Sequence, residues 1–397
     1  MTGPLEGIKV IDLTQVLFGP FTTMLLSDMG AEVIKIERPE VGDIARGNGP
    51  FVNGLSTYFS SLNRGKQSLT LDITQENGRK ILFKLAGQAD IFIETYTPKT
   101  VSELGIGYDE VKKYNPGIIY AAGSGFGMDA PDKYKPAFDV IIQAMGGAMS
   151  ITGEENGEPI RPGVSYGDIT AALFMCIAIL AALNEHNRTG HGQFIDLSML
   201  DCQVAVLENA FVRYFNTGEI PRPLGTRHPV MTPFQLFKTR DSYIAVALRG
   251  GIKNQWPLFC AAIDRVDLID DPRFIDGELR TRNYKILEPI FTPVMQTKTT
   301  ADWMREFEQL GIPCGPYNDI PHAAEDRNLR HRNMFVDIED TQGRKLKVVN
   351  TPFNFALTPG SSKRGAPELG EHTELLLKRI LGLSPEEITQ LRAAKII

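Results

Sequence analysis

The sequence predicts an α/β protein with a parallel sheet, and the order of its first elements is the main observation behind this prediction. A β-rich run at 8–13, a helical segment ending at Met29-Gly30 and a second strand at 32–37 form a strand–helix–strand unit of about 30 residues. Strands joined through a helix in this way run parallel. Further strands are expected at 90–94 and 117–122, each after a helical segment, so the alternation continues.

Length and composition indicate a globular protein of two domains. The chain has 397 residues, which exceeds one ordinary hydrophobic core, and its 23% charged and 42% hydrophobic residues are ordinary. The net charge of -6 argues against a nucleic-acid-binding protein, because that function needs a concentrated basic face. The 4 cysteines lack CxxC spacing and the 6 histidines lack a paired ligand spacing, so we expect reduced thiols and no metal.

Nothing in the sequence indicates a targeting segment, a membrane span or a dinucleotide cofactor. The N-terminus has no charged region followed by an apolar core and a cleavage site. The longest apolar run, Ile169 to Leu183, is shorter than the roughly 20 residues that span a bilayer. The first strand–helix turn has no GxGxxG pattern. We therefore expect a soluble, cytoplasmic protein without a permanently bound cofactor.

The composition changes after a predicted helix at 201–214, which suggests a second domain. The segment 216–233 is rich in Pro and Gly and indicates a linker. A hairpin with strands at 234–237 and 243–248 follows, and then helical stretches at 256–262 and 301–310. These elements predict a smaller α+β domain at about 225–325. Beyond it, a second hairpin surrounds Gln342-Gly343, and Ser384 and Glu387 have the spacing of a capping box.

Asp168 is the candidate around which the chain is organised. Pro162, Gly163 and Gly167 are expected to keep the chain out of helix as far as Asp168, and the apolar run after it predicts a helix buried on most sides. Asp168 is then at or next to the N-cap, where backbone N–H groups and the helix dipole stabilise a carboxylate. An Asp at this place is also a common structural cap, so the pattern alone leaves both roles open.

Several motifs make the chain resemble the class III coenzyme A-transferases, the formyl-CoA transferase and carnitine CoA-transferase family. They are D-L-T-Q-V-L-F-G-P, S-D-M-G-A-E-V-I-K-I-E-R-P-E-V-G-D, N-R-G-K-Q-S-L-T-L-D, G-D-I-T-A-A-L, N-R-T-G-H-G-Q, G-I-P-C-G-P and L-G-E-H-T, in this order. The resemblance implies a Rossmann-like large domain and a small domain in an interlocked dimer. The large domain would then be discontinuous, with 1–215 completed by about 330–397.

The resemblance also implies that Asp168 is the nucleophile of a transferase that takes CoA thioesters as substrates. Arg38 aligns with an arginine that contacts CoA in the family. The remaining CoA-contacting stretches fall on Leu17, Phe18, Leu71, Asp72, Ile73, Thr74, Thr95, Tyr96, Thr97 and Phe138. Tyr96 is expected to stack on the adenine.

Two departures from the family pattern affect the expected site. An arginine that is frequent in the family is Glu103 here, so we expect Lys99 or Arg64 to meet the CoA phosphates instead. The Gly-rich lid of formyl-CoA transferase is missing, and Arg249-Gly250-Gly251 is the nearest approach to it. Formyl-CoA and oxalate are therefore not expected as the substrate pair.

The acceptor acid is inferred from a few side chains. Leu17, Phe18, Phe126 and Phe138 favour a bulky acid, and Arg227 and His228 are candidates for binding a second carboxylate. Together with succinyl-CoA, a donor used in the family, this suggests a hydrophobic or aromatic dicarboxylate such as benzylsuccinate as the acceptor.

The sequence leaves two alternative functions open. An α-methylacyl-CoA racemase-like isomerase needs a histidine base, and that position is Phe138 here. A non-catalytic CoA-binding subunit, paired with a paralogous chain, would have no need of Asp168.

Overall fold

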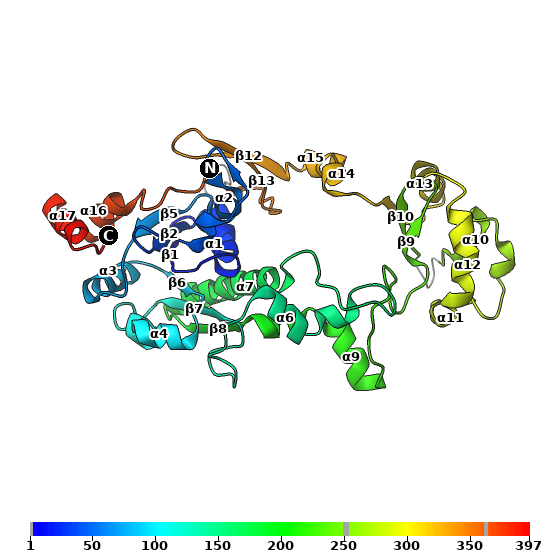
Figure 1. Cartoon of the computed structure of the whole chain (residues 1–397), viewed down its shortest axis with the longest axis horizontal. Coiled ribbons are helices and arrows are strands. Elements are labelled where there is room, and N and C mark those ends of the chain that lie inside the picture. Colours follow the sequence, from blue (N-terminus) through cyan, green and yellow to red (C-terminus); the bar gives the residue numbers. More distant parts are fainter. Residues whose placement is uncertain (1–2, 249–253, 361–363) are drawn as a thin grey trace. The chain divides into compact units, whose positions relative to one another are not determined.

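The computed structural model describes residues 3–248, 254–360 and 364–397 of the chain (Figure 1). The chain divides into two compact units. The first consists of Met1–Ala148, Arg161–Gly218 and Arg327–Ile397, and the second of Met149–Ile160 and Glu219–Asp326. The short segment Met149–Ile160, which was predicted to lie in the large domain, belongs to the second unit.

The first unit is built on a six-stranded sheet in which all pairs are parallel, with the order β5-β2-β1-β6-β7-β8. The winding reverses between β1 and β6, the kind of place where open parallel sheets bind ligands at the carboxyl ends of their strands. The predicted α/β class is thus confirmed. The strands are β1 (Lys9–Asp12), β2 (Glu32–Glu37), β5 (Gln67–Thr70), β6 (Ile91–Glu94), β7 (Ile119–Ser124) and β8 (Phe194–Ser198).

Helices cover both faces of this sheet. Neighbouring residues of β1 point to opposite faces, so Ile11 joins one apolar core and Val10 the other. The core of Ile11 is closed by α3 (Glu76–Ala86), α4 (Pro98–Leu104), α5 (Tyr108–Val111), α16 (Thr373–Leu381) and α17 (Pro385–Ala393). The core of Val10 is closed by α1 (Phe18–Asp28), α6 (Asp139–Met145), α7 (Tyr166–Thr189) and α8 (Met199–Ala205).

Helix α7 is the long apolar helix that the sequence predicts. In the described part of the chain it is the one helix that is long and apolar enough to cross a membrane, and 50% of its most apolar stretch is buried. It packs against α1, α6 and α8. This burial is that of a core helix in a globular unit.

The first unit also contains short elements at its periphery. The helix expected at 201–214 is in fact two helices, since residues 206–207 between α8 and the next helix are not helical. The hairpin around Gln342-Gly343 and the capping box of Ser384 and Glu387 are both confirmed. The short elements are η1 (Ile44–Gly47), β3 (Phe51–Val52), β4 (Leu55–Ser56), α2 (Thr57–Asn63), α9 (Glu208–Thr217), α15 (Arg327–His331), β12 (Phe335–Glu339), β13 (Lys345–Val349) and, at the boundary with the second unit, η2 (Ala148–Ile151).

The second unit packs helices on a three-stranded antiparallel sheet of order β11-β10-β9. Its core is aromatic, with Trp256, Phe259, Phe291, Trp303 and Phe307 almost completely buried. The predicted hairpin and both predicted helices are present. The elements are β9 (Phe234–Lys238), β10 (Tyr243–Ala247), α10 (Trp256–Ala262), η4 (Val266–Leu268), α11 (Gly277–Arg282), α12 (Tyr284–Met295), α13 (Thr300–Gln309), β11 (Cys314–Pro316) and α14 (Ile320–Ala324).

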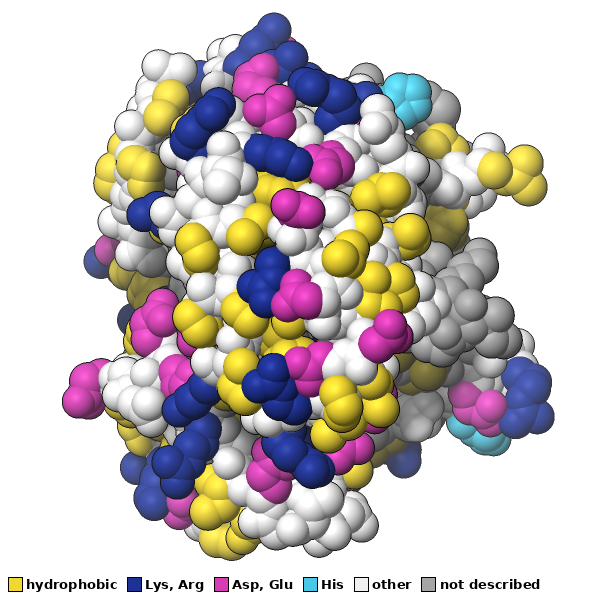
Figure 2. Space-filling view, turned by 90° about the vertical axis from the view of Figure 1, so that its right-hand side faces the viewer, with side chains coloured by type: hydrophobic (Ala, Val, Ile, Leu, Met, Phe, Trp, Pro, Cys, Tyr) yellow, Lys and Arg dark blue, Asp and Glu magenta, His cyan; other side chains and the backbone are white. Residues whose placement is uncertain are grey.

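Figure 2 shows one face of the molecule, on which basic and acidic side chains alternate and the apolar side chains form small separate areas. A surface with both signs of charge mixed in this way is typical of the solvent-exposed side of a globular protein.

Candidate active site

A narrow groove lies at the carboxyl ends of β1 and β2, beside the reversal of winding. Four of the side chains predicted to contact CoA border it, namely Arg38, Leu71, Ile73 and Tyr96. The other lining residues are Leu13, Thr14, Gln15, Lys35, Ile36, Glu37, Gly42 and Asp43. The groove therefore combines an apolar floor, an aromatic ring and an exposed guanidinium at the place where a parallel sheet binds ligands.

A buried network of charges adjoins this groove, and two of its residues, Lys35 and Asp43, are among the lining residues. Lys35 Nζ lies 2.9 Å from Asp43 Oδ2, and Lys66 Nζ lies 3.2 Å from Asp12 Oδ2, with all four side chains at 0% exposure. Lys35 also donates to the carbonyl of Thr14 at 2.7 Å. Because buried charges are costly unless they are paired, these ion pairs hold the loop after β1 in one position.

The loop between β1 and α1 is backbone-strained where it reaches the predicted CoA contacts. Val16 has a φ of 68°, which is rare for a β-branched residue. Its N–H donates to Asp43 Oδ1 at 3.2 Å, so the buried network keeps this conformation in place. Leu17 and Phe18 follow directly, as N-cap and first residue of α1. Strain of this kind is common at binding sites.

Phe18 and Thr95 meet at the end of β7. A Cβ atom on Gly123 would lie 2.5 Å from the Phe18 ring and 3.2 Å from Thr95 Cγ2, so only glycine allows this close approach. The structure thus brings together two predicted CoA contacts from segments far apart in the sequence.

Other predicted CoA contacts have structural roles of their own. Asp72 accepts hydrogen bonds from the backbone and hydroxyl of Thr74, at 3.0 and 2.6 Å, just before α3. Partial burial acts to raise the pKa of Asp72, but these hydrogen bonds outweigh it and hold the pKa below its usual value. Thr97 is the N-cap of α4 and accepts from Thr100 N.

One residue expected to meet the CoA phosphates is not free to do so. Arg64 is buried, and its guanidinium binds both carboxylate oxygens of Asp28, with the shortest distance 2.6 Å. The expectation for Arg64 is therefore wrong. Lys99 is exposed on α4, where it lies 3.8 Å from Glu103. Of the two, Lys99 alone presents its charge to solvent.

Asp168 is the third residue of α7. The helix starts at Tyr166, after Ser165 as N-cap, so the expectation that Gly167 lies outside the helix is wrong. The reason is that the capping side chain comes from another helix. Asp139, on α6, accepts a hydrogen bond from Gly167 N at 2.9 Å. The absence of a side chain on Gly167 allows this contact, because a Cβ there would lie 3.0 Å from Ile142.

Asp139 is the centre of a network next to Asp168. Its Oδ2 accepts from Gln143 Nε2 at 2.8 Å and from Arg161 Nη2 at 2.6 Å. Arg161 Nη2 also donates to the hydroxyl of Ser165 at 3.2 Å. Arg161 and Gln143 were not predicted as site residues, because nothing local in the sequence distinguishes them from surface polar residues.

The carboxyl of Asp168 is half-buried and has a perturbed pKa. Burial and the negative charge of Asp139 raise the pKa of Asp168 to about 7, while Arg161 acts in the opposite direction. Tyr58 on α2 is close enough to respond to this charge. Its pKa is raised by burial and by the charges of Asp168, Asp43 and Asp139, so its phenol stays neutral. Carboxyls with such pKa values are frequent in functional sites.

Three other candidates near Asp168 differ in how accessible they are. Phe126 is 9% exposed and packs in the core of Val10, so it offers little surface to a substrate. Phe138 precedes α6 and is 69% exposed. The N–H of Gly146, directly after α6, donates to the carbonyl of Ile142 at 2.8 Å, so it is not free to stabilise an oxyanion.

Arg227 and His228 lie in the second unit. Arg227 forms an ion pair with Glu155, and its guanidinium lies 4.4 Å from the centre of the Tyr284 ring. The His228 ring packs 4.9 Å from that of Phe234. Arg249-Gly250-Gly251, considered as a lid, lies outside the described residues.

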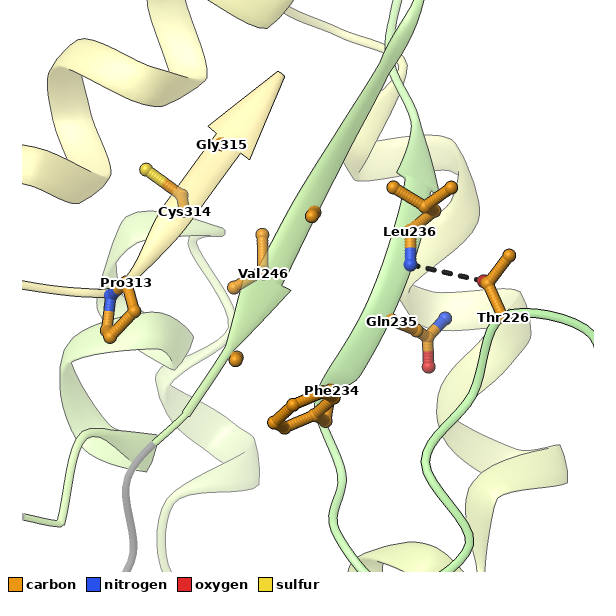
Figure 3. A pocket seen from close by; sticks show the side chains of 10 residues that line it. Thr226, Phe234, Gln235, Leu236, Val246, Pro313, Cys314 and Gly315 are labelled. Carbon is orange, nitrogen blue, oxygen red and sulfur yellow. Dashed lines mark hydrogen bonds between the residues drawn. The ribbon is translucent and has the colours of Figure 1, made fainter. Parts of the chain in front are cut away.

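The second unit also has an apolar pocket on its sheet (Figure 3). Phe234, Leu236, Val246 and Pro313 are among the residues that line it, and Leu236 N donates to Thr226 Oγ1 at 3.1 Å. Among the described residues, no group of three or more His, Cys, Asp or Glu side chains is arranged to hold a metal ion.

Comparison with known proteins identifies the family. Residues 5–373 match the model of CoA-transferase family III. The chain belongs to this family. Succinyl-CoA:glutarate CoA-transferase of Mus musculus is 38% identical over 395 residues, which is 99% of this chain and 90% of that protein. Acetyl-CoA:oxalate CoA-transferase of Acetobacter aceti is 37% identical and covers 95% of each chain.

A solved structure in the same family has a closely similar fold. The CAIB/BAIF family protein of Brucella suis has a TM-score of 0.84 and 33% identity, and the match covers 96% of this chain and 100% of that one. The predicted resemblance to class III CoA-transferases is thus confirmed, and the chain is a transferase that acts on CoA thioesters and carboxylic acids.

Proposed function

We propose that this CoA-transferase moves CoA from succinyl-CoA to a dicarboxylic acid through a covalent intermediate on Asp168. The observation that carries the proposal is the half-buried Asp168 carboxyl in the first turn of α7, with Asp139 and Arg161 beside it. The name of the Mus musculus relative supports succinyl-CoA as donor.

Each step of the proposed reaction exchanges one acyl bond for another. The Asp168 carboxylate attacks the thioester carbonyl of succinyl-CoA, giving a mixed anhydride and CoA thiolate. The thiolate attacks the aspartyl carbonyl, forms the aspartyl-CoA thioester and releases succinate. The acceptor carboxylate then displaces CoA thiolate to give a second anhydride, and the thiolate attacks the acceptor carbonyl, which releases the new thioester and free Asp168. The covalent intermediate divides one difficult transfer into several easier acyl exchanges.

The CoA moiety is proposed to lie in the groove at β1 and β2. Arg38 is exposed there and makes no ion pair among the described residues, so its charge is available to a phosphate. Leu17, Phe18, Thr95, Thr97 and the turn Leu71–Thr74 are proposed to contact CoA through backbone groups and apolar surface. Tyr96 is proposed to stack on the adenine.

For the acceptor, a dicarboxylate of glutarate size is the first candidate, because relatives bear this activity in their names. Benzylsuccinate remains the bulkier candidate. The buried position of Phe126 weakens it, and the exposed Phe138 supports it. Arg227 is paired with Glu155, so it would bind the second carboxylate of the acceptor while it also contacts Glu155. Screening both acids with succinyl-CoA decides between them.

We further propose that the protein is a homodimer. Helices α6, α7 and α8 pack on one another and leave several large apolar side chains exposed, which a second protein surface can cover. These residues are Val140, Met145, Leu173, Ile177 and Val204, at 37% exposure or more. A second copy of this chain carries the same apolar side chains, so two copies can cover each other's without another protein.

The testing experiment is peptide mass spectrometry after incubation with succinyl-CoA, with and without hydroxylamine. The proposal expects the peptide containing Asp168 to gain CoA, or a hydroxamate when hydroxylamine is present. An unmodified Asp168 with transfer still occurring would exclude the covalent route. If transfer is also absent, hydrogen exchange at the α-carbon of 2-methylacyl-CoA would indicate the racemase-like alternative, and its absence a non-catalytic subunit.

A further inference from the structure

Among the described residues, Arg161 is the cation whose charge acts on Asp168. The chain returns from the second unit to the first at Arg161. Its guanidinium donates to Asp139 Oδ2 through both Nε, at 3.2 Å, and Nη2, at 2.6 Å, and it reaches the hydroxyl of Ser165 at 3.2 Å. It therefore links the residue that caps α7 from outside with the residue that forms the N-cap of α7.

We propose that Arg161 is a positioning residue for Asp168: it fixes Asp139 as the cap of α7 and offsets the negative charge that Asp139 places beside the nucleophile. The proposal rests on the proposed function of Asp168 as nucleophile. It adds a residue that touches neither substrate nor the reacting atoms and acts through Asp139.

The contacts explain why Arg161 is needed. Asp139 is 8% exposed, so its charge is not screened well by water. Gln143 and Gly167 N bind it but are neutral, and Arg161 is the only positively charged hydrogen-bond donor to Asp139 among the described residues. Without Arg161, Asp139 would repel a second carboxylate at Asp168 and favour its protonated, unreactive form.

Charged groups on the other elements that pack against α7 have partners of their own or face water. Asp28 on α1 is bound by Arg64, and Asp201 on α8 is exposed. Asp196 on β8 accepts from Met128 N at 3.0 Å. Tyr58 on α2 is neutral, since burial together with the charge of Asp168 raises its pKa. Besides burial, the charges that act on Asp168 are therefore those of Asp139 and Arg161.

The test is the pH dependence of kcat/KM, together with the rate at which succinyl-CoA labels Asp168, in wild type, Arg161→Gln and Arg161→Lys. In Arg161→Gln we expect the acid limb to move up by at least about 0.5 pH unit, and in Arg161→Lys by less. The matched control is Arg188→Gln, which removes an exposed arginine paired with Glu185 at the other end of α7 and should leave the acid limb in place.

Each outcome has a distinct meaning. A uniform loss of activity at every pH, with the acid limb unmoved, would make Arg161 merely structural and overturn the inference. Labelling of wild-type Asp168 in that case would leave the proposed function standing. If wild-type Asp168 is never labelled, the proposed function fails and the inference fails with it.

Discussion

Asp139 accepts a hydrogen bond from the backbone N–H of Gly167 at 2.9 Å, so a side chain of α6 caps helix α7 one residue before Asp168. This contact places a second carboxylate beside the candidate nucleophile. It stabilises the helix start and at the same time makes the charged form of Asp168 less favourable. The two effects can be separated by removing the charge and keeping the shape.

Asp139→Asn is the substitution that does this. The amide oxygen of the new side chain can still accept from Gly167 N, and Gln143 can turn its own amide to accept from the new NH₂ group. Arg161 loses its acceptor on residue 139 and keeps its bond to Ser165, so its positive charge acts in the same direction as the loss of the carboxylate. Because the negative charge is lost, the pKa of Asp168 falls from about 7. The reactive carboxylate then persists to lower pH, so the acid limb of kcat/KM moves down, measured between about pH 5 and pH 9. For Arg161→Gln the acid limb is expected to move the other way. An upward shift of the acid limb in Asp139→Asn would contradict this prediction.

Arg38→Gln tests the proposed CoA groove. Charged hydrogen bonds to a phosphate contribute about 1.5–3 kcal/mol, so KM for succinyl-CoA should rise about 10- to 100-fold with a smaller change in kcat. The comparison is Arg282→Gln, an exposed arginine of the second unit paired with Glu278. Equal KM values in the two variants would place the phosphates elsewhere.

The sequence predicted the parallel sheet because the strands it identified are local apolar runs, and several groove residues lie at or just after the ends of these strands. It did not predict β5, since only Leu69 in that strand is a large apolar residue and its partner strand lies about 30 residues away. Contacts between residues far apart in the sequence were not predicted either. Arg64 looked like a free cation, but Asp28, 36 residues earlier, binds it in the interior.

The start of α7 shows the same limit. Gly167 argues against helix on propensity, and the capping side chain that overrides this preference comes from Asp139, 28 residues away in sequence. Residue types near Asp168 could therefore suggest a nucleophile. Its neighbours Asp139, Arg161 and Tyr58 became apparent only from the folded chain.

Asp12→Asn should destabilise the first unit. Asp12 accepts hydrogen bonds from Thr14, Thr23 and Lys66, and both Lys66 and Lys35 lack exposure to water. Removing one partner of a buried ion pair typically costs about 3–5 kcal/mol, because the remaining charges stay uncompensated. Thermal unfolding should show a lower unfolding temperature for the first unit. The control Glu278→Gln removes an exposed ion pair and should change the unfolding free energy by less than about 1 kcal/mol.

Glu94→Gln should stabilise the protein in a pH-dependent way. Glu94 is fully buried at the end of β6, where its Oε2 accepts from Tyr96 N at 2.7 Å, and burial raises its pKa from 4.5 to about 8. Between these two values the folded protein holds a proton that the unfolded chain has lost, so wild-type stability falls as the pH rises.

Glutamine keeps an acceptor for Tyr96 N and does not titrate. The gain in unfolding free energy over wild type should therefore grow from near zero at about pH 5 to about 2–4 kcal/mol at about pH 8, measured by denaturant unfolding. The exposed Glu110→Gln serves as control, since Glu110 forms a surface ion pair with Lys113. Parallel stability curves for wild type and Glu94→Gln across this range would show that Glu94 ionises normally in the folded protein.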